Sequence, residues 1–120
     1  MKKFLLILSI VFCTSLFTKI YASHVMGADL TFACLGPNKY LITLEVYRDC
    51  RGIALNGPLQ INYSSAQCGV NSTLTLNQVG PPIDITPVCV SNSDACNGGT
   101  GYGIQKYTFQ GILNLSLIHI

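Results

Sequence analysis

The chain has 120 residues, of which 49% are hydrophobic and 10% are charged, with six cysteines and no tryptophan. This length allows one domain of ordinary size, and the sparse charge excludes a disordered acidic or basic tail. The formal charge is +2, but three of the seven basic residues (Lys2, Lys3 and Lys19) lie near the N-terminus. From residue 23 onward, four basic and five acidic side chains leave −1, so no basic stripe for nucleic acid is present.

Residues 1–22 have the order of a secretory signal peptide. Two lysines precede an apolar run over residues 4–12, and the segment ends in the small residue Ala22. The run is shorter than the roughly 20 residues that a membrane-spanning helix needs. We expect cleavage after Ala22, with Ser23 as the second choice. Cys13 would suit a lipoprotein only after a small residue, and Phe12 precedes it. The protein is therefore expected to be secreted or at the cell surface, with membrane contact only during export.

The rest of the chain has the period-2 alternation of β-strands. The turn residues Gly36-Pro37-Asn38-Lys39 join the first two strands into a hairpin. Strands are expected over residues 28–33, 40–47, 59–63, 73–79 and 104–113, with residues 83–86 extended after Pro81-Pro82. Short strands between Gly, Pro and Asn turns predict an all-β fold, an antiparallel β-sandwich that is immunoglobulin-like in general architecture and stapled by disulfides.

Five cysteines remain after the leader: Cys34, Cys50, Cys68, Cys89 and Cys96. In an exported chain they are expected to form disulfides, and without a CxxC pair they do not indicate a zinc site. The short polar segment between Cys89 and Cys96 predicts that these two are bridged. We also expect Cys50 to pair with Cys68. A simple hairpin would hold Cys34 about 30 Å from Cys50, which leaves Cys34 unpaired in this chain.

The last six residues, 115–120, read LSLIHI. This string is similar to the translation of a transposon mosaic-end adapter used in sequencing libraries, although a β-strand would also accommodate its alternation. We expect it to be an adapter translation. The sandwich module would then cover residues 23–114 and be truncated at its C-terminal end, and the partner of Cys34 would lie beyond the truncation.

Three segments are candidate sites. Residues 48–52 follow the expected strand over residues 40–47, which has the strongest β-strand pattern of the chain. They are interpreted as a strand-end turn with a bridged cysteine rather than a ligand loop. Residues 92–99 are rich in oxygen atoms, but their one carboxylate, Asp94, is too few for calcium. His24, beside the expected mature N-terminus, lacks the second histidine of a copper site. No catalytic motif pairs a nucleophile with a base, so no enzyme activity, cofactor or metal is expected.

Several motifs together resemble a known module. The pattern begins with residues 23–31 (SHVMGADLT), continues with residues 34–36 (CLG), and reaches residues 47–50 (YRDC) with Gly52. Residues 68–71, 78–82, 87–89, 96–99 and 103–107 also fit it. The chain is similar to the N-terminal region of large exported proteins of gliding Bacteroidota, which often continue into PKD-type repeats and a gliding-motility-associated C-terminal sorting domain.

The resemblance implies a non-enzymatic structural or adhesion module of a large cell-surface or secreted protein. Its expected partners are downstream domains of the same polypeptide, with an extracellular glycan or another surface protein as further partners. One alternative is a glycan- or matrix-binding module that uses exposed tyrosines, namely Tyr47, Tyr63, Tyr102 and Tyr107. The other is the N-terminal part of an exported enzyme whose catalytic domain lies beyond this fragment.

Overall fold

The computed structural model describes residues 24–87 and 93–115, and these form an all-β antiparallel structure. The expected leader, its cleavage site, Cys13, Cys89 and residues 116–120 lie outside the described residues. The all-β class, the antiparallel pairing and a disulfide staple are confirmed. One short 3₁₀ turn, Ala95–Asn97, is the single helical element of the described part.

Three long strands form the main sheet. β1 (Val25–Gly36) and β2 (Lys39–Asp49) make the predicted hairpin, whose two-residue turn places Asn38 in the left-handed region at φ 59°. β6 (Ile104–Asn114) then pairs antiparallel along the whole of β2. β2 therefore lies between β1 and β6, and β1 lies at one end of the strand order β1-β2-β6-β4-β3.

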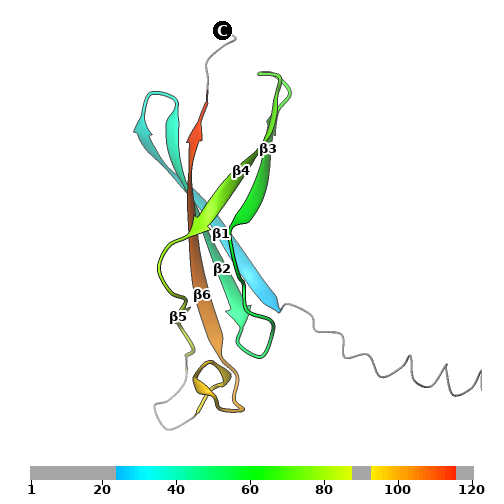
Figure 1. The fold of residues 1–120 in the computed structure, drawn as a ribbon, viewed down its shortest axis with the longest axis vertical. Coiled ribbons are helices and arrows are strands. Elements are labelled where there is room, and N and C mark those ends of the chain that lie inside the picture. The colour runs from blue at the N-terminus through cyan, green and yellow to red at the C-terminus, as the bar shows by residue number, and fades with distance from the viewer. Residues whose placement is uncertain (1–23, 88–92, 116–120) are drawn as a thin grey trace, which may run out of the picture.

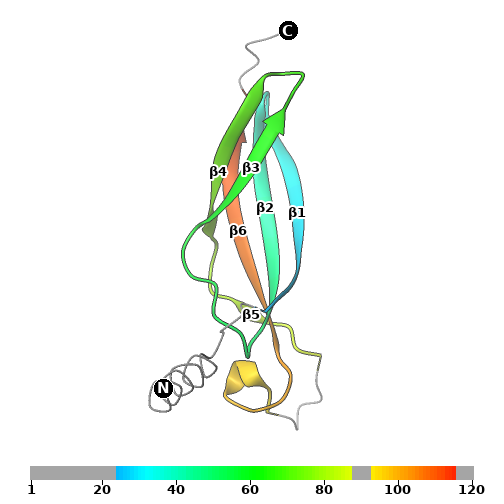
Figure 2. The ribbon, with the colours of Figure 1, turned by 90° about the vertical axis from the view of Figure 1, so that its right-hand side faces the viewer.

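A second hairpin makes the other layer. β3 (Leu59–Ser65) pairs with β4 (Val70–Gln78), and this hairpin lies across one face of the main sheet (Figures 1 and 2). β4 joins the main sheet only at its end, where Asn77 and Gln78 pair with β6. β5 (Ile83–Asp84) pairs with the lower part of β6, which confirms residues 83–86 as an edge segment. Every predicted strand is present, and most extend one to three residues further than expected.

The core lies between the second hairpin and the strands β2 and β6. Val46 of β2 lies directly opposite Tyr107 of β6, so the two side chains project to the same face. Ile42 and Phe109 are each an even number of residues away on the same strands, and alternation therefore directs them to that face as well. Leu76 of β4 closes the core from above, and Leu76 and Phe109 are completely inaccessible to water. Truncation of a fully buried phenylalanine costs about 3–5 kcal/mol, so Phe109 is a main stabilising residue.

Gly111 allows β4 to cross over β6. A Cβ atom at Gly111 would lie 2.7 Å from the carbonyl oxygen of Thr75 and 2.7 Å from Cδ2 of Leu76. One of these atoms belongs to the backbone, so a side chain here would push the two strands apart. The close approach of the two layers therefore depends on a glycine at this position.

We predict that Gly111→Ala destabilises the fold by about 1–3 kcal/mol through overpacking. Gly27→Ala in β1 is the matched control, since nothing lies within 4 Å of its added Cβ atom. Urea unfolding followed by circular dichroism measures both variants. Equal stability of the two variants would contradict the close crossing at Gly111.

Candidate functional site: the disulfide-clamped base

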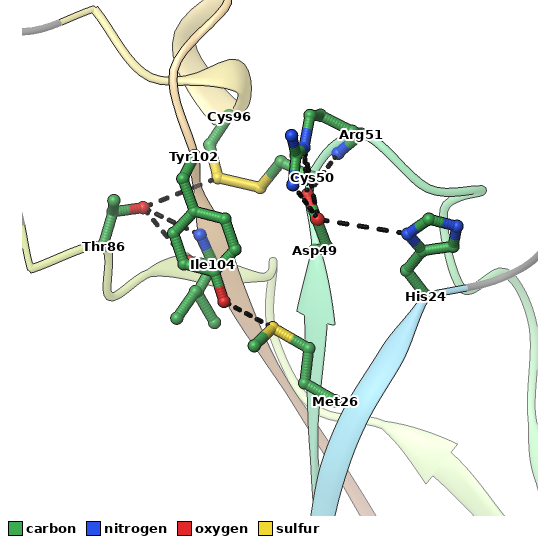
Figure 3. A network of polar contacts seen from close by, with 9 residues as sticks. All are labelled: His24, Met26, Asp49, Cys50, Arg51, Thr86, Cys96, Tyr102 and Ile104. Atoms are coloured by element: carbon green, nitrogen blue, oxygen red, sulfur yellow. Dashed lines mark hydrogen bonds and ion pairs between the residues drawn. A yellow bond between two sulfur atoms is a disulfide. The ribbon is translucent and has the colours of Figure 1, made fainter.

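Chemistry-bearing side chains gather at the end of the sheet where β2 ends and β6 begins (Figure 3). We name this group the base cluster and define it by the following residues: His24, Asp49, Cys50, Arg51, Cys96 and Tyr102. They come from the start of β1, the end of β2 with the turn after it, and the loop that leads into β6. Long-range pairing therefore assembles the cluster from three separate parts of the chain.

The disulfide Cys50–Cys96 is the covalent centre of the base cluster. It spans 46 positions in the sequence, with the two Cα atoms 5.0 Å apart. The backbone N–H of Cys50 also donates to the carbonyl of Gly103 at 3.0 Å, which holds the turn after β2 against the start of β6. A Cβ atom on Gly103 would lie 2.7 Å from Sγ of Cys96, so a glycine is needed where the loop passes the bridge.

The expected pairs Cys50–Cys68 and Cys89–Cys96 are wrong. Cys50 is bonded to Cys96 instead. Cys68 lies in the turn between β3 and β4, at the far end of the second hairpin from the base (Figure 1). Cys89, the expected partner of Cys96, lies outside the described residues. Cys34 and Cys68 are both exposed free thiols. Cys34 lies opposite Tyr40 at the start of β2, so it is separated from Cys50 by the length of that strand, as expected.

Asp49 is the acidic residue of the base cluster, and its pKa is strongly lowered. Its carboxylate is buried and accepts hydrogen bonds from Nη2 of Arg51 at 2.7 Å, from Nε, and from the backbone N–H of Arg51. These bonds to Arg51 lower the pKa of Asp49 from 3.8 to about 2, against the opposing effect of desolvation. Nδ1 of His24 lies 4.0 Å from the same carboxylate. The segment is thus a strand-end turn with a bridged cysteine, as interpreted from the sequence.

Arg48 lies just above the cluster and is buried. Nη1 donates to the carbonyl of Gly52 and Nη2 to the side-chain oxygen of Gln105, each at 2.8 Å. The guanidinium also lies 5.7 Å from the ring centroid of Tyr107, within range of a cation–π interaction. Nε has no partner among the described residues. Sequence reasoning missed Gln105 as a partner, because the two residues are brought together only by the register of β2 with β6.

Two contacts fix the start of β1 to the base. The carbonyl of His24 accepts from the backbone N–H of Asp49 at 2.9 Å. On the other side, the hydroxyl of Tyr102 donates to the sulfur of Met26 at 3.0 Å, while Arg51 lies 5.6 Å from the Tyr102 ring centroid (Figure 3). The sequence placed His24 at an exposed terminus, and its side chain is indeed more than half exposed. Its carbonyl, however, is hydrogen-bonded to the end of β2 just before β1 begins.

In the oxygen-rich segment, Asp94 caps a short 3₁₀ turn. The side chain of Asp94 accepts from the backbone N–H groups of Cys96 and Asn97 and so starts the 3₁₀ turn. Asn97 also donates to both Asp84 and Asp94, which the fold brings together. Asp84, Asp94 and Cys96 could hold a metal by distance alone. Because the Cys96 sulfur is bonded in the disulfide, it is not a free thiolate ligand, and two carboxylates are few for calcium.

The tyrosines named for glycan binding do not form one platform. Tyr107 is buried in the core, so its expected exposure is wrong. Tyr47 is half-buried, and its hydroxyl donates to Asp29 and Glu45 on the face opposite the core. Tyr63 lines a cavity of about 530 Å³ between the tip of the second hairpin and the end of β6, whereas Tyr102 lies in the loop before β6 at the opposite end of that strand.

Comparison with protein-family models, with curated proteins and with solved structures finds no match to this chain. In the part of the chain that the structure describes, no helix has the length and apolar character needed to cross a bilayer.

We predict that Cys50→Ser with Cys96→Ser lowers the free energy of unfolding by about 2–4 kcal/mol, because the bridge closes a long loop. The matched control is Cys34→Ser with Cys68→Ser, which removes two exposed thiols and leaves stability unchanged. Urea unfolding measures the difference, and peptide mapping without reduction identifies the bridge. A map that joins Cys96 to any cysteine other than Cys50 would contradict this assignment.

The depressed pKa of Asp49 predicts loss of stability in acid. An ionised Asp49 stabilises the fold fully above about pH 4, and this contribution is lost as the pH falls towards 2. We expect about 1–2 kcal/mol, reduced by screening because Arg51 is 56% exposed. Asp49→Asn and Arg51→Gln should each flatten the unfolding free energy between these pH values. Glu45→Gln, in the partly exposed pair with Lys106, should change the pH dependence of the unfolding free energy less. A steep acid limb retained in Asp49→Asn would contradict the prediction.

Proposed function

We propose that this chain is a non-enzymatic structural or adhesion module of a large secreted or cell-surface protein. The observation that carries the proposal is the Cys50–Cys96 bridge, which joins the turn after β2 to the 3₁₀ turn in the loop before β6, at the base of the main sheet. Disulfides of this kind persist in oxidising compartments, which agrees with a leader-like N-terminus. The motif resemblance supports the same class of protein.

The polar contacts of the base also favour a structural role. Asp49 is bonded to Arg51, Arg48 to Gly52 and Gln105, and Asp94 to the turn that it caps. These charged groups hold the chain's own turns together, and each such contact orders a segment that would otherwise be a free loop. Such a module serves as a rigid structural unit between neighbouring domains rather than as a catalyst.

The proposal predicts that the protein is exported and displayed. In cells that produce the full-length gene product, an antibody against residues 24–114 should label intact cells. The mature N-terminus should be Ser23 or His24. Deletion of residues 4–12 removes the apolar run and is the matched control, which should retain the protein inside the cell. Labelling only after permeabilisation, together with retention of Met1, would sink the proposal.

The gene beyond codon 114 separates the structural role from the exported enzyme. We expect repeats of immunoglobulin-like type and a sorting domain, and a contig edge at the codons for residues 115–120. A hydrolase domain in the continuing reading frame would replace the structural proposal with the enzyme. Independent reads that continue through codons 115–120 unchanged would contradict the adapter origin of that segment.

A further inference from the structure

The apolar face of β1 is not covered by the second hairpin. Ala28, Leu30 and Phe32 share the face of Ile42 and Val46, with which their strand is in register. The partly buried residues that pack on the core come from other strands and from the loop after β2, and none comes from β1. Leu30 is 60% exposed and Phe32 is 74% exposed. The core face therefore continues onto β1 as open apolar surface.

The backbone edge of β1 is also open. β1 ends the strand order, so one side of a twelve-residue strand has no partner among the described strands (Figure 2). Natural edge strands are blunted by lysine, proline, bulges or short length. β1 has no lysine or proline and a single charged residue, Asp29, while its irregularities lie at its two ends, at Val25/Gly27 and Cys34/Gly36. The regular segment between them is unprotected.

The other edges of the described sheet differ in this respect. β3 places the polar residues Gln60, Asn62 and Ser64 at its exposed positions. β5 has two residues and follows Pro81-Pro82. An exposed edge with large apolar side chains is a site of strand addition, and β1 is the one long edge of this kind in the described part of the chain.

We propose that β1 is a homodimer interface, in which β1 of a second copy of this chain adds antiparallel to β1 with Thr31 on the two-fold axis. Leu30 then lies opposite the partner's Phe32, and Phe32 opposite the partner's Leu30. Directly opposed residues of antiparallel strands project to the same face. The apolar faces of the two copies therefore join into one, and each copy gains a hydrogen-bonded neighbour along Ala28–Cys34.

The charge on Asp29 selects this register. An axis through Asp29 would place two carboxylates directly opposite each other, and an axis through Leu30 would place them on a diagonal about 7–8 Å apart. With the axis at Thr31, Asp29 faces the partner's Ala33, and the two carboxylates are offset by about 13 Å along the strands. An axis nearer the C-terminal end of β1 shortens the regular overlap, because the bulge at Cys34/Gly36 interrupts it. The near-neutral charge from residue 23 onward adds no strong repulsion between copies.

The mass of the exported chain as a function of concentration is the first test, by sedimentation velocity. We expect a monomer–dimer equilibrium that Leu30→Lys or Phe32→Lys weakens by about tenfold or more. Both side chains lie mostly in solvent, so the monomer should keep its circular dichroism spectrum. Ile112→Lys is the matched control, because Ile112 is 47% exposed on the opposite face of β6, and it should leave the equilibrium unchanged.

Cross-linking is the second test, and it depends on no destabilising change. In a background with Ser at Cys34, Cys68 and Cys89, Thr31→Cys should form a disulfide-linked dimer under mild oxidation. Asn62→Cys, at an exposed position of the other long edge, should not. A monomer at every concentration would overturn the proposal, as would cross-linking at Asn62 but not at Thr31. A monomer that binds an extracellular polysaccharide through Leu30 and Phe32 would overturn it as well, because the surface would then belong to another partner.

Discussion

The pairing of β2 with β6 is the constraint on which the rest of the structure depends. The register runs without a shift from Lys39↔Asn114 to Asp49↔Ile104, and it joins segments that are more than 50 residues apart in the chain. It aligns the core residues of the two strands on one face. It also brings the turn after Asp49 beside the loop before Ile104, where the disulfide closes. Because the bridge and the core share this pairing, each strengthens the other: the staple limits fraying at the base, and the core fixes the geometry that the staple needs.

Local patterns of the sequence predict the strands and the first turn well. The alternation in residues 40–47 and the turn at Pro37-Asn38 are properties of a few adjacent residues, and the structure has both. The interpretation of residues 48–52 as a bridged strand-end turn also rests on local chemistry. It holds because Asp49 and Arg51 are two residues apart and can bond within the turn itself.

The cysteine pairing could not be predicted in the same way. The expected Cys89–Cys96 bridge rested on short sequence distance, whereas the observed bridge spans 46 positions and follows from strand order. The partnership of Arg48 with Gln105 and that of Tyr102 with Met26 have the same origin, since each joins elements that meet only in the assembled sheet. The burial of Tyr107 was missed for a related reason. Alternation places Tyr107 on one face of β6, but only the position of the second hairpin decides that this face is covered.

The base cluster and the open edge of β1 are physically connected. An edge strand binds a neighbour more tightly when it is already held in extended form, because less conformational entropy is lost on pairing. β1 is held in extended form by its hydrogen bonds to β2. Two more hydrogen bonds fix its start, from the backbone N–H of Asp49 to the His24 carbonyl and from the Tyr102 hydroxyl to the Met26 sulfur. Asp49 is in turn ordered by Arg51, and the loop of Tyr102 by the bridge through Cys96 and by Gly103. The disulfide therefore does more than stabilise the core: it helps to preorganise the strand whose apolar side has no covering layer among the described residues.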